Sequence, residues 1–145
     1  MASLTFAVSS TAADMTAEHR VADAVTFLTT ERRQPQSPAA PNPLETLLAS
    51  LAGCMNVVAR MVAREQGVDL QRLSFTVEGT LDPRGMMGDP DVAPYFEAVS
   101  VRVMAEGNLT PAQLEALRTE VDRRCPVHRL FEAARITLRE SWVRA

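Results

Sequence analysis

The first thirty residues alternate between hydrophobic and polar positions in the manner of β-strands. Residues 4–8 and residues 25–29 each show this period of two, which places successive side chains on opposite faces of a strand. Residues 15–22 lie between them and offer a partner strand. We therefore predict an N-terminal hairpin or meander of two or three strands within residues 1–33.

A proline-rich connector and a long helix follow these strands. Residues 34–43 hold four of the chain's nine prolines, and this density excludes a helix there and favours an extended connector. Asn42 is the expected N-cap of a helix that starts at Pro43, since proline suits the first helical position. Glycine commonly ends helices, so Gly67 predicts that this helix covers residues 43–66.

The predicted helix is apolar on nearly all sides. Its hydrophobic residues recur at three- and four-residue steps, and no charged residue lies between Glu45 and Arg60. The longest strongly apolar, uncharged run within it, residues 46–59, has 14 residues and is too short to span a bilayer. We therefore expect the helix to lie in the centre of the fold or at an interface.

The C-terminal part, residues 72–143, mixes strand and helix patterns. The predicted elements are, in order, a strand at 73–79, a long loop at 82–94, a strand at 99–103, a helix at 108–124 with a capping box at Thr110, a short helix at 127–133 and a last strand at 136–143. Strands that are adjacent in sequence, together with separate helices, predict a single α+β domain over residues 1–145 rather than a doubly wound sheet.

Composition narrows the classes of function. The chain has 145 residues, of which 46% are hydrophobic and 23% charged, so we expect one globular domain with a substantial core. Its net charge of −3 argues against nucleic-acid binding by bulk electrostatics. All 15 basic residues are arginines, which excludes a Schiff-base or P-loop lysine. No basic residue precedes the apolar stretch at the N-terminus, so we expect no secretory signal and a cytoplasmic protein without a membrane partner.

The two cysteines, Cys54 and Cys125, are the candidate reactive groups. Cys54 lies midway along the apolar helix, where no neighbour on the same face can act as a general base. It is therefore either a small buried hydrophobic residue or a nucleophile whose thiolate is stabilised by a cation from another segment. Cys125 precedes Pro126 at the start of the short helix, where the helix N-terminus, Arg123 and Arg124 would lower the pKa of a thiol. The alternative is a half-exposed cysteine in a turn.

Glu45 and the two histidines give weaker signals. Glu45 lies nine residues before Cys54, which is about 13 Å along a straight helix and half a turn away. The two side chains therefore cannot touch unless the helix bends or Glu45 comes from a second subunit; otherwise Glu45 complements the helix dipole. The spacing of His19 and His128 relative to the cysteines gives no support for a metal site.

Two motifs resemble those of the OsmC/Ohr family. The segment P-L-E-T-L-L-A-S-L-A-G-C at residues 43–54 is similar to the family's P-x-E-x-L-L-x-x-L-x-x-C helix, and R-C-P-V at residues 124–127 is similar to its C-P-V segment. Residues 63–67 and 77–85 also look like the OsmC-like branch, and the resemblance covers roughly residues 40–143. It implies an OsmC-like α+β fold with antiparallel sheets around a central cysteine-bearing helix, formed by two chains intertwined as a homodimer.

The same resemblance implies thiol peroxidase chemistry that requires no metal or organic cofactor. Cys54 would attack an organic hydroperoxide or hydrogen peroxide, and Cys125 would resolve the sulfenic acid as a disulfide. An external dithiol, in the family often a lipoyl-type group, would then reduce that disulfide. Peroxidase members use an arginine from the N-terminal strands and a glutamate directly after the helix proline. Here the glutamate, Glu45, comes one position later, and Arg20 is the nearest candidate cation, followed by Arg33.

Two other functions stay open. The shifted Glu45, together with the lack of a G-G-R turn in the first hairpin, also fits a non-catalytic dimeric ligand-binding or stress-associated protein on the same scaffold. In that case the apolar interface and the loop with Met86 and Met87 would hold a small lipophilic ligand. A disulfide reductase is disfavoured, because the chain has no C-x-x-C motif.

Overall fold

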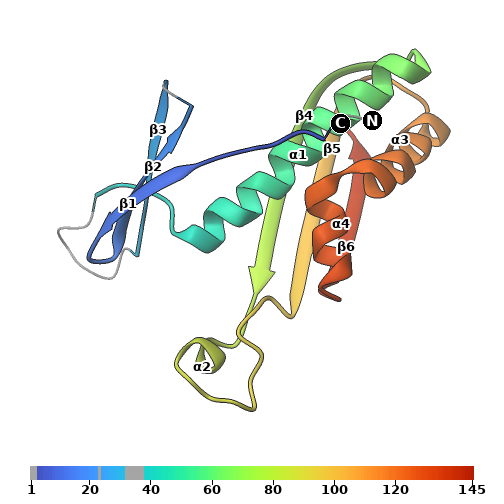
Figure 1. Ribbon diagram of the computed structural model, residues 1–145. Helices are drawn as coiled ribbons and strands as arrows, with labels where there is room; N and C mark the ends of the chain where they lie inside the picture. Colours follow the sequence, from blue (N-terminus) through green and yellow to red (C-terminus); the bar gives the residue numbers. More distant parts are fainter. Residues whose placement is uncertain (1–2, 23, 32–37) are drawn as a thin grey trace. The chain divides into compact units, whose positions relative to one another are not determined.

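The computed structural model of the protein describes residues 3–22, 24–31 and 38–145 (Figure 1). The chain divides into two compact units, residues 1–47 and residues 48–145, and the border between them falls inside the longest helix. Each unit has its own three-stranded sheet. The predicted α+β class is confirmed.

The N-terminal unit is built on an antiparallel meander, as predicted. Its strands pair in chain order and are β1 (Ser9–Ala13), β2 (Thr16–Val21) and β3 (Val25–Thr30). The first strand starts later than predicted, because residues 4–8 lie outside the sheet. The hairpin closes with Ala13 opposite Thr16, and Asp14 between them adopts the left-handed conformation, at φ 55°, that tight hairpin turns use. The turn, rather than the hydrophobic alternation, therefore selects the residues that pair.

Only part of the predicted proline-rich connector can be followed. Residues 32–37, which include the candidate Arg33, lie outside the described residues. Beyond them, the backbone N–H of Thr30 donates a hydrogen bond of 3.0 Å to the carbonyl of Pro41. This bond holds the end of the connector beside the end of β3.

Helix α1 (Pro43–Gln66) begins and ends where the sequence predicted. The Asn42 side chain accepts the Glu45 N–H at 2.8 Å, and the Glu45 carboxylate accepts the Asn42 N–H at 2.9 Å, which forms a reciprocal capping box. Gly67 follows with a φ of 65°, a conformation that glycine adopts without strain.

Helix α1 buries only one stripe of its apolar surface. It is long and apolar enough to span a membrane by length and composition, but core helices of soluble proteins pass the same test, and 33% of its apolar window is buried within the protein. The buried residues share one face and recur at three- and four-residue steps: Leu51, Met55, Val58, Ala59, Val62 and Ala63. This periodicity fits a helix packed on a core along one side.

The C-terminal unit holds the second sheet, in the order β4–β5–β6. These strands are β4 (Asp69–Thr80), β5 (Ala98–Asn108) and β6 (Thr137–Arg144). The pair β4–β5 is antiparallel, whereas β5 and β6 are parallel, so this sheet is mixed rather than antiparallel throughout as expected. Two helices connect β5 to β6, and this crossover returns the chain to the end of the sheet at which β5 began.

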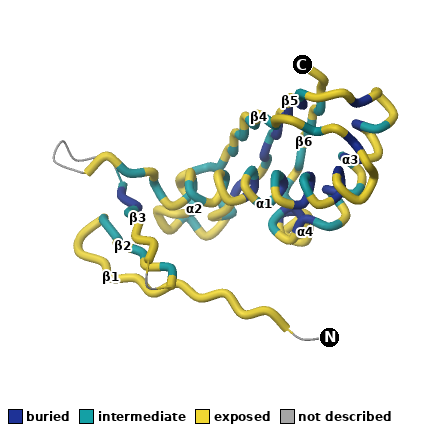
Figure 2. The backbone as a smooth tube through the Cα atoms, turned by 90° about the horizontal axis from the view of Figure 1, so that it is seen from above, coloured by how far each residue is buried: buried dark blue, intermediate teal, exposed yellow. Residues whose placement is uncertain are grey.

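Helices α3 (Pro111–Arg124) and α4 (Pro126–Ala133) lie with α1 over one face of this sheet (Figure 2). The capping box predicted at Thr110 is present, with Gln113 as its partner. Every second residue of β5 points into the core beneath the helices and is buried: Val99, Val101, Val103 and Ala105. The intervening positions, such as Arg102, face outward.

The loop between β4 and β5 contains one short helix that the sequence did not predict. Helix α2 (Pro83–Met86) is capped by Asp82, whose carboxylate accepts the Arg84 N–H at 3.0 Å. The Arg84 guanidinium pairs with the same carboxylate at 2.6 Å. This local arginine–aspartate pair favours a helical turn where prolines and glycines had suggested an open loop.

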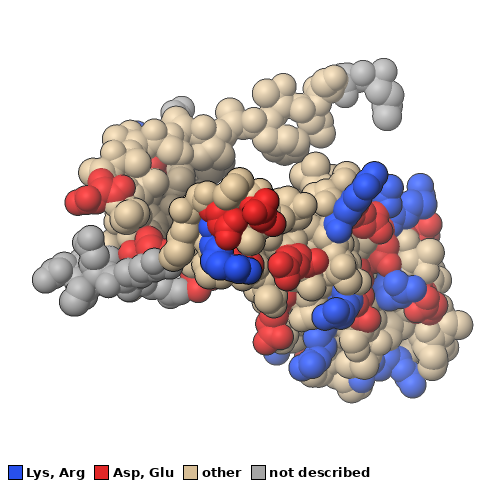
Figure 3. Space-filling view, turned by 90° about the horizontal axis from the view of Figure 1, so that it is seen from below, with Lys and Arg blue, Asp and Glu red and all other residues tan. Residues whose placement is uncertain are grey.

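Charges of both signs are mixed on the surface. On the face shown in Figure 3, arginine side chains lie among aspartate and glutamate side chains rather than in a patch of one sign. Several neighbours pair along α3, including Arg118 with Glu115 at 2.6 Å and Arg123 with Glu120 at 2.7 Å. This face therefore offers no extended basic surface for a polyanion.

Candidate active site

Cys54 lies in the fourth turn of α1, beside the buried stripe of that helix. Its neighbour Met55 is wholly buried, and so is Leu51 one turn earlier, whereas Cys54 itself is half-buried. Gly53 before it is exposed. Cys54 therefore sits at the edge of the core, where a small solute from solvent can reach it.

Cys125 lies at the junction of α3 and α4 and is fully buried. Its N–H donates to the carbonyl of Val121 at 2.8 Å and completes α3, while its carbonyl accepts the Arg129 N–H at 3.0 Å and starts α4. Pro126 has no N–H and cannot continue α3, so the chain turns at Cys125, whose backbone is extended. The alternative of a half-exposed turn cysteine is wrong, because this turn points into the core.

The two cysteine side chains are in contact. The Cys54 side chain lies close enough to the thiol of Cys125 to raise its pKa, although 71 positions separate them in the sequence. Both are free cysteines in this structure. The helix that carries Cys54 and the junction that carries Cys125 thus bring the two thiols close together.

Burial controls the ionisation of Cys125. Removal from water raises the pKa of its thiol to about 11, and the neighbouring Cys54 acts in the same direction. The backbone amides of His128 and Val127, at the start of α4, lower the pKa, as the sequence predicted for a helix N-terminus, but they are outweighed. At neutral pH Cys125 therefore keeps its proton and can donate it toward Cys54.

The arginines beside Cys125 are engaged elsewhere. Arg124 forms a two-pronged ion pair with Glu65 of α1, with contacts of 2.5 and 2.9 Å, and Arg123 pairs with Glu120. Both arginines were expected from the sequence to favour a thiolate at Cys125, but their charges are balanced by these carboxylates. The Arg124–Glu65 pair instead ties the end of α1 to the turn that holds Cys125.

The structure describes Arg20 and Glu45 in other contacts. Arg20 lies on β2, with its largely exposed side chain 3.6 Å from Glu18, and Glu45 belongs to the capping box of α1. Both belong to the N-terminal unit, whereas Cys54 belongs to the C-terminal unit. Their roles toward Cys54 stay predictions.

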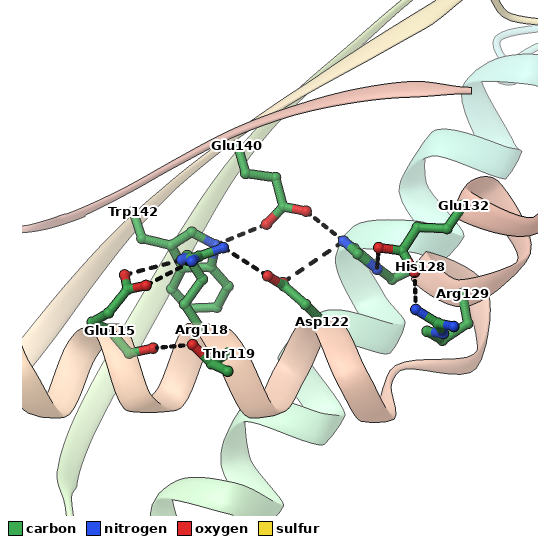
Figure 4. A network of polar contacts seen from close by, with 9 residues as sticks. All are labelled: Glu115, Arg118, Thr119, Asp122, His128, Arg129, Glu132, Glu140 and Trp142. Atoms are coloured by element: carbon green, nitrogen blue, oxygen red, sulfur yellow. Dashed lines mark hydrogen bonds and ion pairs between the residues drawn. The ribbon is translucent and has the colours of Figure 1, made fainter. Parts of the chain in front are cut away.

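A buried polar network around His128 was missed by the sequence analysis (Figure 4). The His128 side chain is 2% exposed, and its Nε2 atom is hydrogen-bonded to Glu140 on β6 and lies 3.7 Å from Asp122 Oδ1 on α3. Trp142 Nε1 donates to the second Glu140 oxygen at 3.2 Å. One signal was visible in the sequence: Glu140 occupies an inward position of a strand whose alternation predicts an apolar residue there.

Comparisons with known proteins agree with this architecture. Residues 34–141 match the family described as OsmC-like protein. Among solved structures, an OsmC-like protein from Mycoplasma pneumoniae has a TM-score of 0.84 at 14% identity, with 98% of each chain covered. Among curated proteins, none matches the chain.

Two further solved structures have the same fold. The organic hydroperoxide resistance protein OsmC from Legionella pneumophila has a TM-score of 0.67 at 21% identity, with 100% of this chain and 99% of that chain covered. The organic hydroperoxide resistance protein OhrB of Bacillus subtilis has a TM-score of 0.63 at 16% identity, with 98% of each chain covered.

Proposed function

Because the chain belongs to the OsmC-like family, we propose that it is a cysteine-based thiol peroxidase that reduces organic hydroperoxides or hydrogen peroxide. Two proteins of similar fold are named organic hydroperoxide resistance proteins, which supports a redox-related stress function. In this proposal Cys54 is the peroxidatic cysteine and Cys125 the resolving cysteine.

The contact between the two thiols carries the proposal. The half-buried Cys54 is the thiol that a peroxide can reach, and the fully buried Cys125 is protected from direct oxidation. Because Cys125 holds its proton at neutral pH, its S–H group can stabilise negative charge on the Cys54 sulfur. The two environments therefore suit two different steps of one reaction.

The proposed reaction has three balanced steps. The Cys54 thiolate attacks the terminal oxygen of the hydroperoxide, the O–O bond breaks, and the leaving alkoxide takes up a proton to become the alcohol, or water from hydrogen peroxide. Cys54 is left as a sulfenic acid, oxidised by two electrons. The Cys125 sulfur then attacks the Cys54 sulfur, the S–O bond breaks, and the hydroxyl group leaves with the thiol proton as water. An external dithiol, such as a lipoyl-type group, reduces the resulting disulfide and is itself oxidised to a disulfide.

The activating cation in this proposal is an arginine. A peroxidatic thiolate needs a nearby positive charge, and the chain has no lysine. We assign this role to Arg20, with Glu45 as its orienting carboxylate. The variant Arg20→Gln is expected to slow the peroxide step at pH 7, whereas Glu18→Gln, which removes only the partner of Arg20 on β2, is the matched control.

We further propose that the working unit is a cytoplasmic homodimer. Helix α1 exposes apolar side chains opposite its buried stripe, with Val57 56% and Met61 49% exposed. A second copy of the chain would cover such a face. Light scattering coupled to size exclusion tests this: a monomer at micromolar concentration contradicts the dimer without touching the thiol chemistry.

Rapid mixing with an organic hydroperoxide tests the peroxidase proposal. The wild-type chain is expected to lose both thiols and gain one intramolecular disulfide. The variant Cys54→Ala is expected not to react, and Cys125→Ala is expected to stop at a sulfenic acid that a dimedone probe traps. If the wild-type chain consumes peroxide no faster than free cysteine at the same pH, the proposal is wrong.

The exposed methionines of the α2 loop favour a second candidate function. Met86 is 59% and Met87 71% exposed, and flexible methionine side chains suit an adaptable apolar binding surface. A non-catalytic ligand-binding protein would retain a small lipophilic molecule in native mass spectrometry and lose it in Met86→Ser and Met87→Ser. It would also show the same thiol reactivity as free cysteine.

A further inference from the structure

Three ionisable side chains of the C-terminal unit converge in a cluster that the peroxide chemistry does not use. They are Asp122 of α3, His128 of α4 and Glu140 of β6, and one ligand atom from each lies within 4.8 Å of the other two. Figure 4 shows the carboxylates of Asp122 and Glu140 directed at the same nitrogen of the His128 ring. We propose that this cluster is a binding site for one divalent transition-metal ion of the Zn²⁺ type.

The donor set fits such an ion. An imidazole nitrogen with two carboxylate oxygens is a common ligand combination for first-row divalent metals, whereas Mg²⁺ and Ca²⁺ prefer oxygen ligands alone. Ligand bonds of about 2.0–2.2 Å place neighbouring ligand atoms about 3–3.5 Å apart. Asp122 Oδ1, now 3.7 Å from His128 Nε2, would move slightly closer to that nitrogen. Glu140 would give up its hydrogen bond to the same nitrogen and move slightly away from it.

Two buried polar atoms without a hydrogen-bond partner point independently to a cation site. Asp122 Oδ1 has no hydrogen-bond partner, although it faces His128 Nε2 at 3.7 Å, a distance too long for a hydrogen bond. His128 Nδ1 also has no partner and lies 4.0 Å from Glu132 Oε1. Both atoms are themselves buried, although the Asp122 side chain as a whole is 20% exposed and that of His128 only 2%. An ion bound between Asp122 and His128 would satisfy the carboxylate oxygen and fix the His128 proton on Nδ1, facing Glu132.

Two of the three proposed ligands, Asp122 and Glu140, also have an outer partner that orients them. Arg118 donates to the second oxygen of Asp122 at 2.7 Å, and Trp142 Nε1 donates to the second oxygen of Glu140 at 3.2 Å. Such outer hydrogen bonds are typical of ligating carboxylates and histidines in metal sites.

The charged side chains around the site carry a net negative charge that a divalent cation would balance. Three carboxylates, those of Glu115, Asp122 and Glu140, surround the single positive charge of Arg118. Counting these carboxylates and Arg118 alone, the excess is two negative charges, which one divalent ion balances.

The position of the site connects it to the α3–α4 junction. Asp122 lies three residues before Cys125 and His128 three residues after it, while Glu140 lies on the neighbouring strand. A single ion would therefore join α3, α4 and β6 around the turn that holds Cys125. The inference does not depend on the proposed peroxidase activity, since none of the three ligands takes part in it.

Zinc and cobalt binding to the full-length, reduced chain tests the inference. After treatment with a chelator, the wild-type chain is expected to bind one Zn²⁺ per chain in competition with a fluorescent zinc indicator at pH 7.5. The isosteric variants Asp122→Asn and Glu140→Gln are expected to weaken binding by at least about 10-fold. Circular dichroism and thermal unfolding verify that both variants are folded.

Two controls separate this site from other ligands. The double variant Cys54→Ser/Cys125→Ser is expected to bind Zn²⁺ as tightly as the wild-type chain, because the proposed site contains no sulfur. The variant His19→Gln, which changes the only other histidine, is also expected to bind normally. With Co²⁺, the wild-type spectrum is expected to lack the near-ultraviolet band of a cobalt–thiolate bond.

Several results would overturn the inference. They are a wild-type chain that binds no stoichiometric Zn²⁺, binding that is lost in the double cysteine variant, and binding that survives in folded Asp122→Asn and Glu140→Gln. The first of these results would leave a protonated His128 as the cation between the two carboxylates. If the carboxylate variants do not fold, the cobalt spectrum of the double cysteine variant decides: an N/O-ligand spectrum supports the site, and no bound cobalt refutes it.

Discussion

The buried thiol of Cys125 makes the stability of the protein sensitive to alkaline pH. Its pKa is about 11 in the folded chain against 9.0 for an ordinary cysteine thiol. Below pH 9 the thiol is protonated in both states and contributes nothing to the pH dependence. Between pH 9 and 11 it ionises in the unfolded chain only, so the unfolded state is favoured and stability falls.

The size of this effect follows from the difference of about two units between the pKa of Cys125 in the folded chain and that of an ordinary cysteine thiol. Each unit corresponds to about 1.4 kcal/mol, so the free energy of unfolding is expected to fall by about 3 kcal/mol between pH 9 and 11 and then level off. Other side chains contribute little to the pH dependence between pH 9 and 11, because the chain has no lysine and one tyrosine. Urea unfolding of the reduced wild-type chain and of Cys125→Ala, at equal protein concentration, isolates the contribution of Cys125.

The difference between the two unfolding curves is the measurement that matters. Loss of packing in Cys125→Ala is independent of pH and shifts its curve by a constant amount. In Cys54→Ala the alkaline fall is expected to be smaller but still present, because burial is the main cause of the shift and Cys54 a lesser one. If the stabilities of wild type and Cys125→Ala stay parallel from pH 9 to 11, Cys125 is not a buried thiol and the reasoning fails.

Three further predictions concern the Cys54–Cys125 disulfide and the packing of the core. A disulfide between Cys54 and Cys125 would close a loop of 71 positions, so oxidation by one equivalent of peroxide is expected to raise the free energy of unfolding by about 4 kcal/mol. Dithiothreitol is expected to reverse this gain. Urea unfolding that is identical before and after oxidation would contradict the prediction. Leu117→Ala removes a wholly buried side chain of α3 and is expected to cost about 2–5 kcal/mol in the same assay, and a cost below about 1 kcal/mol would argue against the described packing of α3. Gly79→Ala places a methyl group 2.6 Å from the Phe96 ring and is expected to cost about 1–3 kcal/mol, whereas the double variant Gly79→Ala/Phe96→Leu should recover part of that loss.

Local signals in the sequence were sufficient for both long helices and for their ends, except that α3 begins at Pro111 rather than at residue 108. Helix α1 runs over residues 43–66 as predicted, because its start and stop depend on residues close to it: Asn42, Pro43 and Gly67. The capping box at Thr110 is likewise a matter of four consecutive residues. Caps and helical periodicity are properties of short segments, and no distant partner is needed to read them.

Strand pairing was harder to predict, because it involves distant residues. The first strand was misplaced since hydrophobic alternation does not show where a hairpin turns, and Asp14 decides this. The direction of β6 depends on the path of the crossover through α3 and α4, which returns the chain to the end of the sheet where β5 begins. The site around His128 was missed for the same reason, because Asp122 and Glu140 reach it from two other elements.

The amino-acid sequence by itself determined the helix that carries Cys54, the turn that carries Cys125 and the family motifs around both. It could not determine that the two thiols meet or that Cys125 resists ionisation. Both facts arise from the packing of α1 against the α3–α4 junction, which excludes water from Cys125 and places the Cys54 side chain against it. Proximity and burial depend on contacts between segments 71 positions apart, and only the tertiary structure supplies those contacts.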